Sequence, residues 1–445
     1  MILPRKLKDD LALTIRNLAV LFQCDLDVFE DEKGERVELS SNTKKVRLPI
    51  PNLLVWRTQQ AAIVHWRGIE LPQVERMDEE YPDVLGLAYY LFNDLEEVRQ
   101  EASSPEERYD ITRSNLNNVY QSNYLDRIVS ELRNDLSVFV VPNPGVILTH
   151  DLDFLSLKGF HLRRSFVGIA TPKKWQEWRK KLRFLKSRYE EFKKRFHCFE
   201  EFEFLDWIDI EREHGYKSVF FVFADGRKDG FEGDAWYHLG YRNRKAPLFT
   251  LRRTLRALVQ EGYRVGLHLS RSSNYRWDQI VTEFESLAES MGRRIDCTRN
   301  HWFWVRFSNW HTYLHQLGVL FDFNVAAQGF AKGTAFPYLA KNESTVVFPT
   351  TYMDDTVFKS KNLYLNREEA LALLNGQIDT LVQNGGCVAI SFHPAEDGPL
   401  GTLKIANKLS FYKEVLDVLS KRGIGVYLPE EAREKFFGHE VQWRF

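Results

Sequence analysis

The chain has 445 residues, of which 44% are apolar, and this is enough for one large hydrophobic core or two ordinary ones. Its 61 lysine and arginine residues balance 62 aspartate and glutamate residues, so the net charge of -1 excludes a general attraction to nucleic acid or to an anionic membrane. Neither a signal peptide nor a run of about 18 apolar residues is recognisable, so we expect a cytoplasmic protein without a transmembrane segment.

The first part of the chain has the pattern of a small α/β module. Helices are predicted first and last, with strands between them, over residues 7–22, 44–50, 61–67 and 82–98. The next stretch, 96–117, is polar and contains Ser-Ser-Pro, which predicts a surface loop or linker. A domain boundary is therefore expected between this stretch and Pro144, with residues 1–140 forming the first domain.

From residue 146 onward, β-rich runs alternate with helical patterns. The β-rich runs cover residues 145–154, 217–224, 263–270, 294–304, 319–326, 344–355, 386–394 and 423–429. The helical patterns cover residues 173–196, 248–262, 277–292, 367–386 and 408–423. Seven or eight β/α units of this kind predict a parallel barrel or a doubly wound sheet, and in both architectures chemistry gathers at the carboxyl edge of the strands.

Two carboxylates follow the first of these strands. Asp151 and Asp153 come after the apolar run 146–148 and are two positions apart, which places them on one side of an extended chain. Such a pair suits one metal ligand and one general base. Taken alone, it is more often part of a turn or a helix cap.

Histidines end two further strands, at His268 and His393. A single histidine in such a place is usually structural, but two of them with an aspartate pair on one sheet edge indicate an open site for a divalent ion such as zinc. Another strand end offers Arg299, which can orient a carboxylate, and His301. The alternative is that Arg299 is a surface salt-bridge partner and His301 a packed core residue.

In this order the motifs resemble those of the polysaccharide deacetylases, carbohydrate esterase family four with the NodB-type homology domain. The resemblance covers residues 146–429 and rests on Thr-His-Asp-Leu-Asp, Gly-Leu-His-Leu-Ser, Arg-Asn-His-Trp-Phe and Ile-Ser-Phe-His-Pro, with Ser-Val-Phe-Phe-Val-Phe-Ala between the first two. It implies an irregular (β/α)7 barrel over residues 141–445. A subgroup of the family also carries a smaller accessory domain, which residues 1–140 resemble through the stretch 82–98.

The resemblance also implies the roles of individual residues. Asp151 would be the general base, held in place by Arg299, and His393 the general acid. Asp153 and His268 would bind the metal ion, for which zinc is the expected identity.

One position departs from the family pattern. A second metal-binding histidine normally stands four residues after the first, and this chain has Ser272 there. The first candidate for the missing ligand is His301 and the second is His150. The subgroup with the accessory domain resembles this chain at that position and in the stretch 353–356, so the serine can be its norm.

The resemblance implies hydrolysis of an N-acetyl or O-acetyl group on a glycan or sugar precursor. Trp302, Trp304 and Tyr352 are candidate platforms for a sugar ring, and Asp354 is a further candidate substrate contact. Two alternatives stay open: a deacylase of another linear amide, such as a lipid-linked formyl sugar, and an inactive binding protein of glycan assembly. The sugar, the acyl group and the oligomeric state are left undetermined.

The four cysteines are far apart and lack the close pairing of a zinc–thiolate site. In the reducing compartment expected for this chain, such residues are structural thiols. We therefore expect neither a disulfide nor chemistry from Cys24, Cys198, Cys297 and Cys387.

Overall fold

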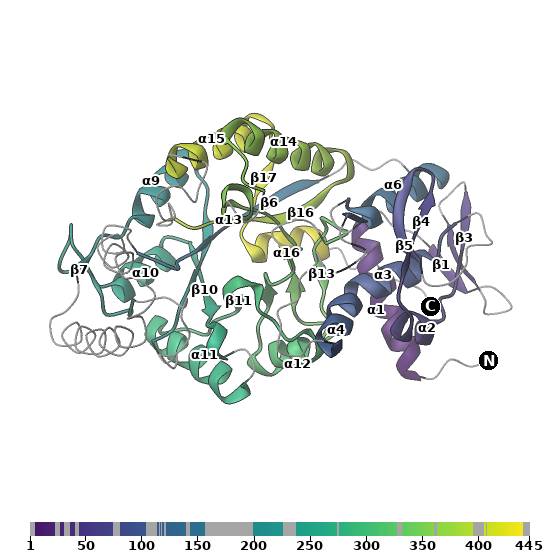
Figure 1. The fold of residues 1–445 in the computed structure, drawn as a ribbon, viewed down its shortest axis with the longest axis horizontal. Helices are drawn as coiled ribbons and strands as arrows, with labels where there is room; N and C mark the ends of the chain where they lie inside the picture. Colours follow the sequence, from purple (N-terminus) through teal and green to yellow (C-terminus); the bar gives the residue numbers. More distant parts are fainter. Residues whose placement is uncertain are drawn as a thin grey trace, which may run out of the picture.

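The computed structural model describes most of the chain and gives an α/β architecture (Figure 1). The described residues are 5–22, 27–30, 36–40, 44–73, 81–103, 114, 116, 118–119, 122–138, 143–155, 199–225, 237–273, 276–326, 332–359, 363–394, 405 and 407–438. Among them, no helix combines the length and the apolar character needed to cross a membrane. The predicted helix over 173–196 lies outside this set, as do Cys24 and Cys198, whereas Cys297 and Cys387 are buried free thiols as expected.

The N-terminal segment combines helices with two small antiparallel sheets. Its helices are α1 (Arg5–Phe22), α2 (Leu53–Thr58), α3 (Val84–Phe92), α4 (Leu95–Ser103) and α6 (Tyr124–Asp135). One sheet contains β1 (Asp27–Glu30), β2 (Arg36–Ser40) and β3 (Lys45–Pro49), and the other contains β4 (Ala62–Trp66) and β5 (Ile69–Gln73). The linker predicted over 96–117 is wrong in its first part, because α4 continues the helical pattern to residue 103 after a break at Asp94, where φ is +52°.

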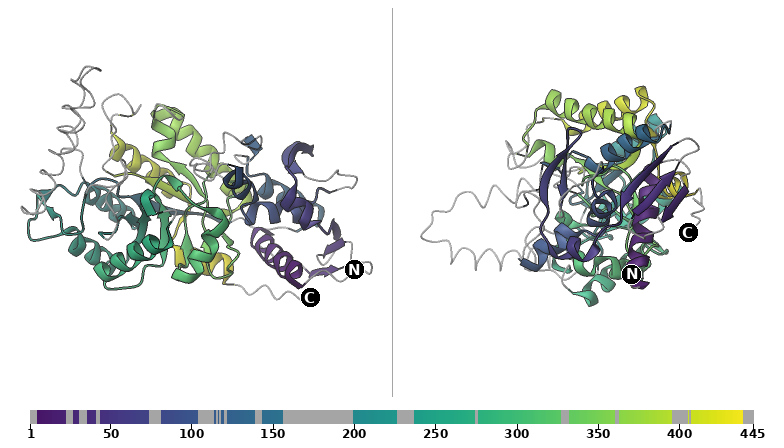
Figure 2. Two further views of the ribbon diagram at one scale, coloured as in Figure 1. Left: turned by 60° about the horizontal axis from the view of Figure 1, so that its bottom comes forward. Right: turned by 90° about the vertical axis from the view of Figure 1, so that its right-hand side faces the viewer.

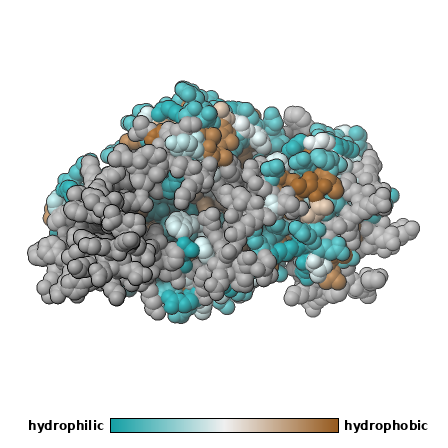
Figure 3. Space-filling model, viewed as in Figure 1, coloured by the Kyte–Doolittle hydropathy of each residue, from teal (hydrophilic) through white to brown (hydrophobic). Residues whose placement is uncertain are grey.

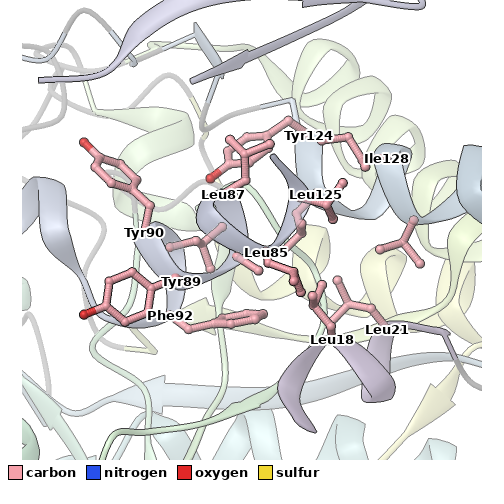
Figure 4. Packing of buried hydrophobic residues seen from close by; sticks show 14 of the residues in the cluster. Leu18, Leu21, Leu85, Leu87, Tyr89, Tyr90, Phe92, Tyr124, Leu125 and Ile128 are labelled. Carbon is pink, nitrogen blue, oxygen red and sulfur yellow. The ribbon is translucent and has the colours of Figure 1, made fainter. Parts of the chain in front are cut away.

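Helix α3 is the centre of the N-terminal core. All nine of its residues are buried, and it packs between α1 and α6 (Figure 4). The helix begins at its cap Asp83, whose side chain accepts a hydrogen bond from the backbone N–H of Gly86 at 2.9 Å and one from the indole of Trp56 at 2.6 Å. A helix that is apolar on every side is stable in water only when other elements surround it, and α1 and α6 provide that cover.

The same core continues into the second part of the chain. Val325, Phe336 and Tyr338 belong to one cluster of buried side chains with the residues of α1, α3 and α6. Asn17 of α1 bonds both backbone groups of Leu339, accepting from its N–H at 2.7 Å and donating to its carbonyl at 2.9 Å. The boundary between residues 1–140 and 141–445 stays a prediction, and the core that crosses it is continuous.

A ten-stranded, mostly parallel sheet forms the second part. Its strands run in the order β13 (Tyr338–Leu339), β14 (Val346–Val347), β12 (Phe321–Asp322), β11 (Cys297–Asn300), β10 (Arg264–Leu269), β8 (Ser218–Val222), β6 (Pro144–Asp151), β16 (Gly386–Phe392) and β15 (Thr350–Met353), with β17 (Gly425–Val426) also paired to β6. Only β13 runs antiparallel to its neighbour. The sheet curls, and helices cover its outer side (Figures 1 and 2).

The covering helices follow the strands in the predicted alternation. They are α9 (Phe204–His214), α10 (Leu251–Gln260), α11 (Trp277–Met291), α12 (Phe307–Leu317), α13 (Asp354–Phe358), α14 (Arg367–Asn384), α15 (Lys408–Lys421) and α16 (Pro429–Phe437); a separate short pair is formed by β7 (Phe199–Glu200) and β9 (Arg242–Asn243). Nearly every residue of β6, β8 and β16 is buried, as expected for parallel strands covered on both faces. The predicted α/β class is confirmed, and the curled parallel sheet is consistent with the predicted barrel, whose count of seven units stays a prediction.

The surface of the described residues is largely hydrophilic on the face seen in Figure 3, with apolar patches between the polar residues. Leu248, Leu54 and Trp302 are among the exposed large apolar side chains. Of these, Trp302 lies beside the residues described next.

Candidate metal centre

The strand register brings the predicted site residues to one edge of the sheet. In the pairing of β10 with β11, His268 lies opposite Arg299, and in the pairing of β6 with β8, Asp151 lies opposite Phe221. His393 directly follows β16, the other neighbour of β6. Because these strands are parallel, their carboxyl ends meet, and side chains that are far apart in the sequence become neighbours.

Asp153, His268 and His301 form a buried cluster at this edge. The Nε2 atom of His268 is 3.1 Å from Oδ1 of Asp153, and Nε2 of His301 is 3.4 Å from Oδ2 of the same carboxylate. One atom from each residue lies within 4.8 Å of the other two. Two imidazoles and one carboxylate are a ligand set that catalytic zinc takes, with a further position left open.

The hydrogen bond of His268 fixes which of its nitrogens is available. Its Nδ1 lies 2.9 Å from the backbone carbonyl oxygen of Arg299, which only accepts, so Nδ1 carries the proton. In the neutral imidazole, Nε2 then carries a lone pair, which faces a carboxylate oxygen of Asp153. Within the described part of the chain, neither Nε2 of His268 nor Oδ1 of Asp153 has a hydrogen-bond partner. Two acceptors held this close need a proton or a cation between them, and a divalent ion fits these residues.

The electrostatics of Asp153 agree with a cation site. Burial raises the pKa of its carboxyl group, but His301 and His268, in their protonated forms, outweigh that effect and hold the pKa well below its ordinary value. The group is therefore an anion at neutral pH, although it is buried. A buried anion is stable only when positive charge or hydrogen-bond donors lie against it.

Arg299 is completely buried and joins its own strand β11 to β6, β16 and β15. Its Nη1 donates to Oδ1 of Asp151 at 2.9 Å, to Oγ1 of Thr149 at 2.9 Å and to Oγ of Ser391 at 2.7 Å. Its Nη2 donates to Oγ1 of Thr350 at 3.2 Å. Burial lowers the pKa of this guanidinium, while the neighbouring Asp151 carboxylate opposes the shift. Asp151 is thus held by a fixed cation on one oxygen.

His393 faces both aspartates from the other side. Its Nε2 is 3.9 Å from Oδ2 of Asp151 and 3.8 Å from Oδ2 of Asp153. Its Nδ1 is 2.6 Å from Oδ1 of Asp354, and its backbone N–H donates to Oδ2 of Asp354 at 2.9 Å. Buried Lys408 donates to that same Oδ2 at 2.9 Å and to the His393 carbonyl at 2.6 Å.

Asp354 is therefore placed behind His393. Burial raises its pKa, but Lys408 and His393 outweigh burial and hold the pKa far below its ordinary value. The carboxylate fixes the ring of His393 with Nδ1 protonated, so that Nε2 faces the centre of the site. This placement differs from the substrate contact that the sequence predicted for Asp354, and that role stays untested.

The predicted sugar platforms occupy different surroundings. Trp302 is 43% exposed, and its ring centroid is 5.1 Å from that of His301. Trp304 is half-buried and lies against the guanidinium of Arg271. Tyr352 is fully buried in the core under α14, where its hydroxyl lies 3.5 Å from the carbonyl of Ala370. The role predicted for Tyr352 stays untested, but its position is that of a core residue.

The two candidates for the missing ligand are separated by strand geometry. His301 completes the cluster, whereas His150 points to the opposite face of β6, because neighbouring residues of a strand alternate. There its Nε2 lies 2.6 Å from Oε1 of Glu211, within a core that includes Tyr412. Ser272 belongs to a short 3-10 turn (Arg271–Ser273), and its side chain is outside the described set.

Sequence reasoning missed the residues that support the site. Lys408 begins α15 after a stretch without a recognisable motif, so nothing in its neighbourhood marked it as a partner of Asp354. Thr149 and Ser391 lie near the ends of predicted strands, and Thr350 lies within the β-rich run 344–355. A buried arginine at such an edge needs several acceptors, and that requirement was the signal that could have found them.

Comparisons with solved structures found distant likenesses. A Mycobacterium smegmatis protein classed as a polysaccharide deacetylase is 15% identical over 69% of this chain and 94% of its own, with a TM-score of 0.43. An allantoinase is 11% identical over 67% and 91%, with a TM-score of 0.39. The family 4 carbohydrate esterase of Streptomyces lividans is 10% identical over 64% and 93%, with a TM-score of 0.30. No family model and no curated protein matches the chain.

Proposed function

We propose that this protein is a metal-dependent hydrolase that removes an acyl group, in the first place an N-acetyl group, from a sugar. The observation that carries the proposal is the cluster of Asp153, His268 and His301, in which a carboxylate oxygen and an imidazole lone pair face each other 3.1 Å apart. These three residues would hold a divalent ion, with zinc as the expected one. When bound, such an ion lowers the pKa of a water molecule toward about 7 and polarises a carbonyl group.

Asp151 is the group suited to accept the proton of the attacking water. Its Oδ1 is engaged by Arg299, while its Oδ2 faces the centre of the site and lies 3.9 Å from His393. The fixed guanidinium keeps the carboxylate in one orientation. A base held in this way needs no rearrangement when the reaction begins.

His393 is the group suited to donate a proton to the leaving nitrogen. Oδ1 of Asp354 lies 2.6 Å from Nδ1 of His393, so the second proton of the imidazolium is carried at Nε2, which faces Asp151 and Asp153. The buried Lys408 keeps Asp354 ionised and in place. The proposed acid and base therefore lie beside each other, with Nε2 of His393 3.9 Å from Oδ2 of Asp151. Amide hydrolysis needs such an acid because the amine leaves only when protonated.

The first test is the metal content of protein purified without chelator, measured by elemental analysis. We expect about one equivalent of zinc or a similar ion per wild-type chain and a loss of the metal in Asp153→Ala. Asp225→Ala is the matched control, because Asp225 lies after the parallel strand β8 but faces His238 and Arg252. No metal in the wild type, even after reconstitution, would reject the metal-dependent hydrolase and favour a binding protein.

The second test measures the reaction. Release of acetate from N-acetylated sugars, absent in Asp151→Asn and His393→Gln that still bind metal, is the expected result. Metal binding without acetate release, together with release of another carboxylic acid from linear amides, would move the proposal to a different acyl group.

A further inference from the structure

Arg271 occupies a defined place at the rim of the candidate metal centre. It follows β10 by two residues and is three positions after His268. Its guanidinium lies 3.9 Å from the ring centroid of Trp304 and 5.1 Å from that of Trp302. A planar guanidinium stacked on indole rings keeps its N–H donors in the plane, directed away from the ring faces.

The backbone beneath these rings is unusual. Trp302 and Phe303 both have positive φ, at 59° and 52°, in a region that large side chains rarely adopt. Conformations of this kind persist where the surroundings impose them, and they concentrate at binding and catalytic sites. Here the turn directs Trp302 outward beside His301 and leaves 43% of its surface exposed.

Arg271 and Trp302 together provide two kinds of contact beside the metal cluster. The ring of Trp302 lies next to His301, and the guanidinium of Arg271 lies next to Trp302. An exposed indole face suits the apolar face of a pyranose ring, and a guanidinium suits a carboxylate or a phosphate. A ligand that used both would be a sugar with an anionic group.

We propose that Arg271 is a specificity-determining residue that binds an anionic substituent, a carboxylate or a phosphate, on a sugar stacked against Trp302. This inference rests on the proposed function, which places the acyl group of the sugar at the metal cluster. Binding of the anionic sugar to Arg271 and Trp302 does not itself require turnover. It makes acidic or phosphorylated acetamido sugars the substrate class and neutral acetamido sugars poor ligands.

The test is calorimetric titration of the full chain with three probes: N-acetylmuramic acid for the carboxylate, N-acetylglucosamine 1-phosphate for the phosphate, and neutral N-acetylglucosamine. We expect one or both anionic probes to bind at least about tenfold more tightly than the neutral probe. Arg271→Met should remove that difference while changing the affinity for the neutral probe less than about threefold. Whichever anionic probe binds more tightly identifies the source of the charge.

Controls separate recognition of charge from support of the tryptophans. Arg253→Met is the matched control, since Arg253 also stacks on an aromatic ring, with its guanidinium 4.8 Å from the centroid of Phe249, and should leave all three affinities unchanged. Arg271→Lys keeps the charge without the planar fork and should retain part of the preference, which also covers the case in which Arg271→Met does not fold. Equal binding of all probes to the wild type, or equal weakening of all probes by Arg271→Met, would overturn the inference.

The outcome is distinguishable from that of the proposed function. The hydrolase proposal fails if Asp153→Ala retains its metal and the wild-type protein releases no acetate. A preference for anionic sugars that depends on Arg271 would then still stand as a binding property of this rim.

Discussion

Arg299 contributes more to the structure of the site than to its chemistry. It is the common partner of Thr149, Asp151, Ser391 and Thr350, which come from three different strands, and the rings of Phe221 and Phe323 lie 4.7 Å and 5.7 Å from its guanidinium. A cation so placed is stable only because each donor direction meets an acceptor or a ring face. Removing it leaves a buried carboxylate unpaired.

Replacement of Arg299 by methionine is therefore expected to lower the free energy of unfolding by roughly 3–5 kcal/mol, the usual effect of removing one partner of a buried ion pair. Urea denaturation of the wild type and the variant measures this. Arg293→Met is the control: Arg293 is 39% exposed and lies 3.7 Å from Asp296, so its loss should cost no more than about 1 kcal/mol. Equal effects of the two substitutions would contradict the role assigned to Arg299.

His301 is the candidate for the metal ligand that Ser272 does not supply. Replacement of His301 by alanine should weaken metal binding by at least about tenfold, because two ligands replace three. Competition with a chromogenic chelator gives the dissociation constant. His214→Ala, which removes a histidine paired with Asp417 at 2.9 Å on the outer surface, should leave that constant unchanged. An unchanged constant in His301→Ala would assign the third ligand to another group.

For single residues, the sequence predicted the candidate site best where residue type and position in a strand agreed. Asp151, Asp153, His268 and His393 could be singled out because each polar side chain lies at the end of an apolar run, and their roles stay predictions. His150 could have been set aside from the sequence alone, because it lies between Thr149 and Asp151 and so points to the other face. Tyr352 and Lys408 could not be placed, because burial depends on which helices cover a strand and no local pattern contains that information.

The strands and helices, like the site residues, could be predicted where the sequence pattern was clear. Each β-rich run predicted after residue 143 contains at least one strand, from β6 to β17, since buried parallel strands read as continuous apolar runs. Helices α10, α11, α14 and α15 lie within their predicted ranges. The two-residue strands β7, β9 and β13 were missed because they lie outside the β-rich runs and are too short to show periodicity of their own. The break between α3 and α4 was missed because it depends on one positive φ at Asp94.

Helix α6 is attached to the second part of the chain by a buried carboxylate. Asp126 accepts hydrogen bonds from the hydroxyl of Thr334 and from the backbone N–H of Ala335, the latter at 2.7 Å. Burial raises the pKa of Asp126 to about 7, against an ordinary value of 3.8, although these hydrogen bonds act in the opposite direction. The folded chain therefore holds a proton on this group at pH values where the unfolded chain has already released it.

The stability that Asp126 contributes should therefore fall as the pH rises. The folded state binds more protons than the unfolded state between about pH 4 and pH 7, so the stability contributed by Asp126 is greatest below pH 4 and is lost as the pH rises to 7. At about 1.4 kcal/mol per pKa unit, the loss is on the order of 4 kcal/mol. Asp126→Asn should flatten the dependence of unfolding free energy on pH in this range. A wild-type slope that persists in Asp126→Asn would refute this.

For the whole molecule, the two predicted domains share more than a linker. Besides the common apolar core, buried Lys332 forms ion pairs with Asp94 and with Glu97, the latter at 2.7 Å. His311 of α12 lies 3.1 Å from Asp94 as well. Charges buried at a contact between two parts are stable only when both parts are present, so separation would expose apolar surface and leave these groups without their partners.

We therefore expect the full chain to unfold in one cooperative transition. Urea unfolding should give the same midpoint by circular dichroism at the helix band and by fluorescence of the tryptophans, which occur in both parts. Asn17→Ala should lower the unfolding free energy by about 1–3 kcal/mol, because it leaves the backbone groups of Leu339 unsatisfied. The single urea midpoint should therefore fall by the same amount for both probes. Two separated transitions would show that residues 1–140 and 141–445 are independent units.

The paired hydrogen bonds of Asn17 have one more consequence. Strand β13 is the last strand on its side of the sheet, and its outward backbone groups are of the kind that recruit a strand from another molecule. The amide of Asn17 imitates a neighbouring strand at Leu339, with one donor and one acceptor in the right places. The N-terminal segment thus covers this sheet edge at Leu339. A chain shortened to residues 141–445 is expected to expose the edge to pairing with other molecules.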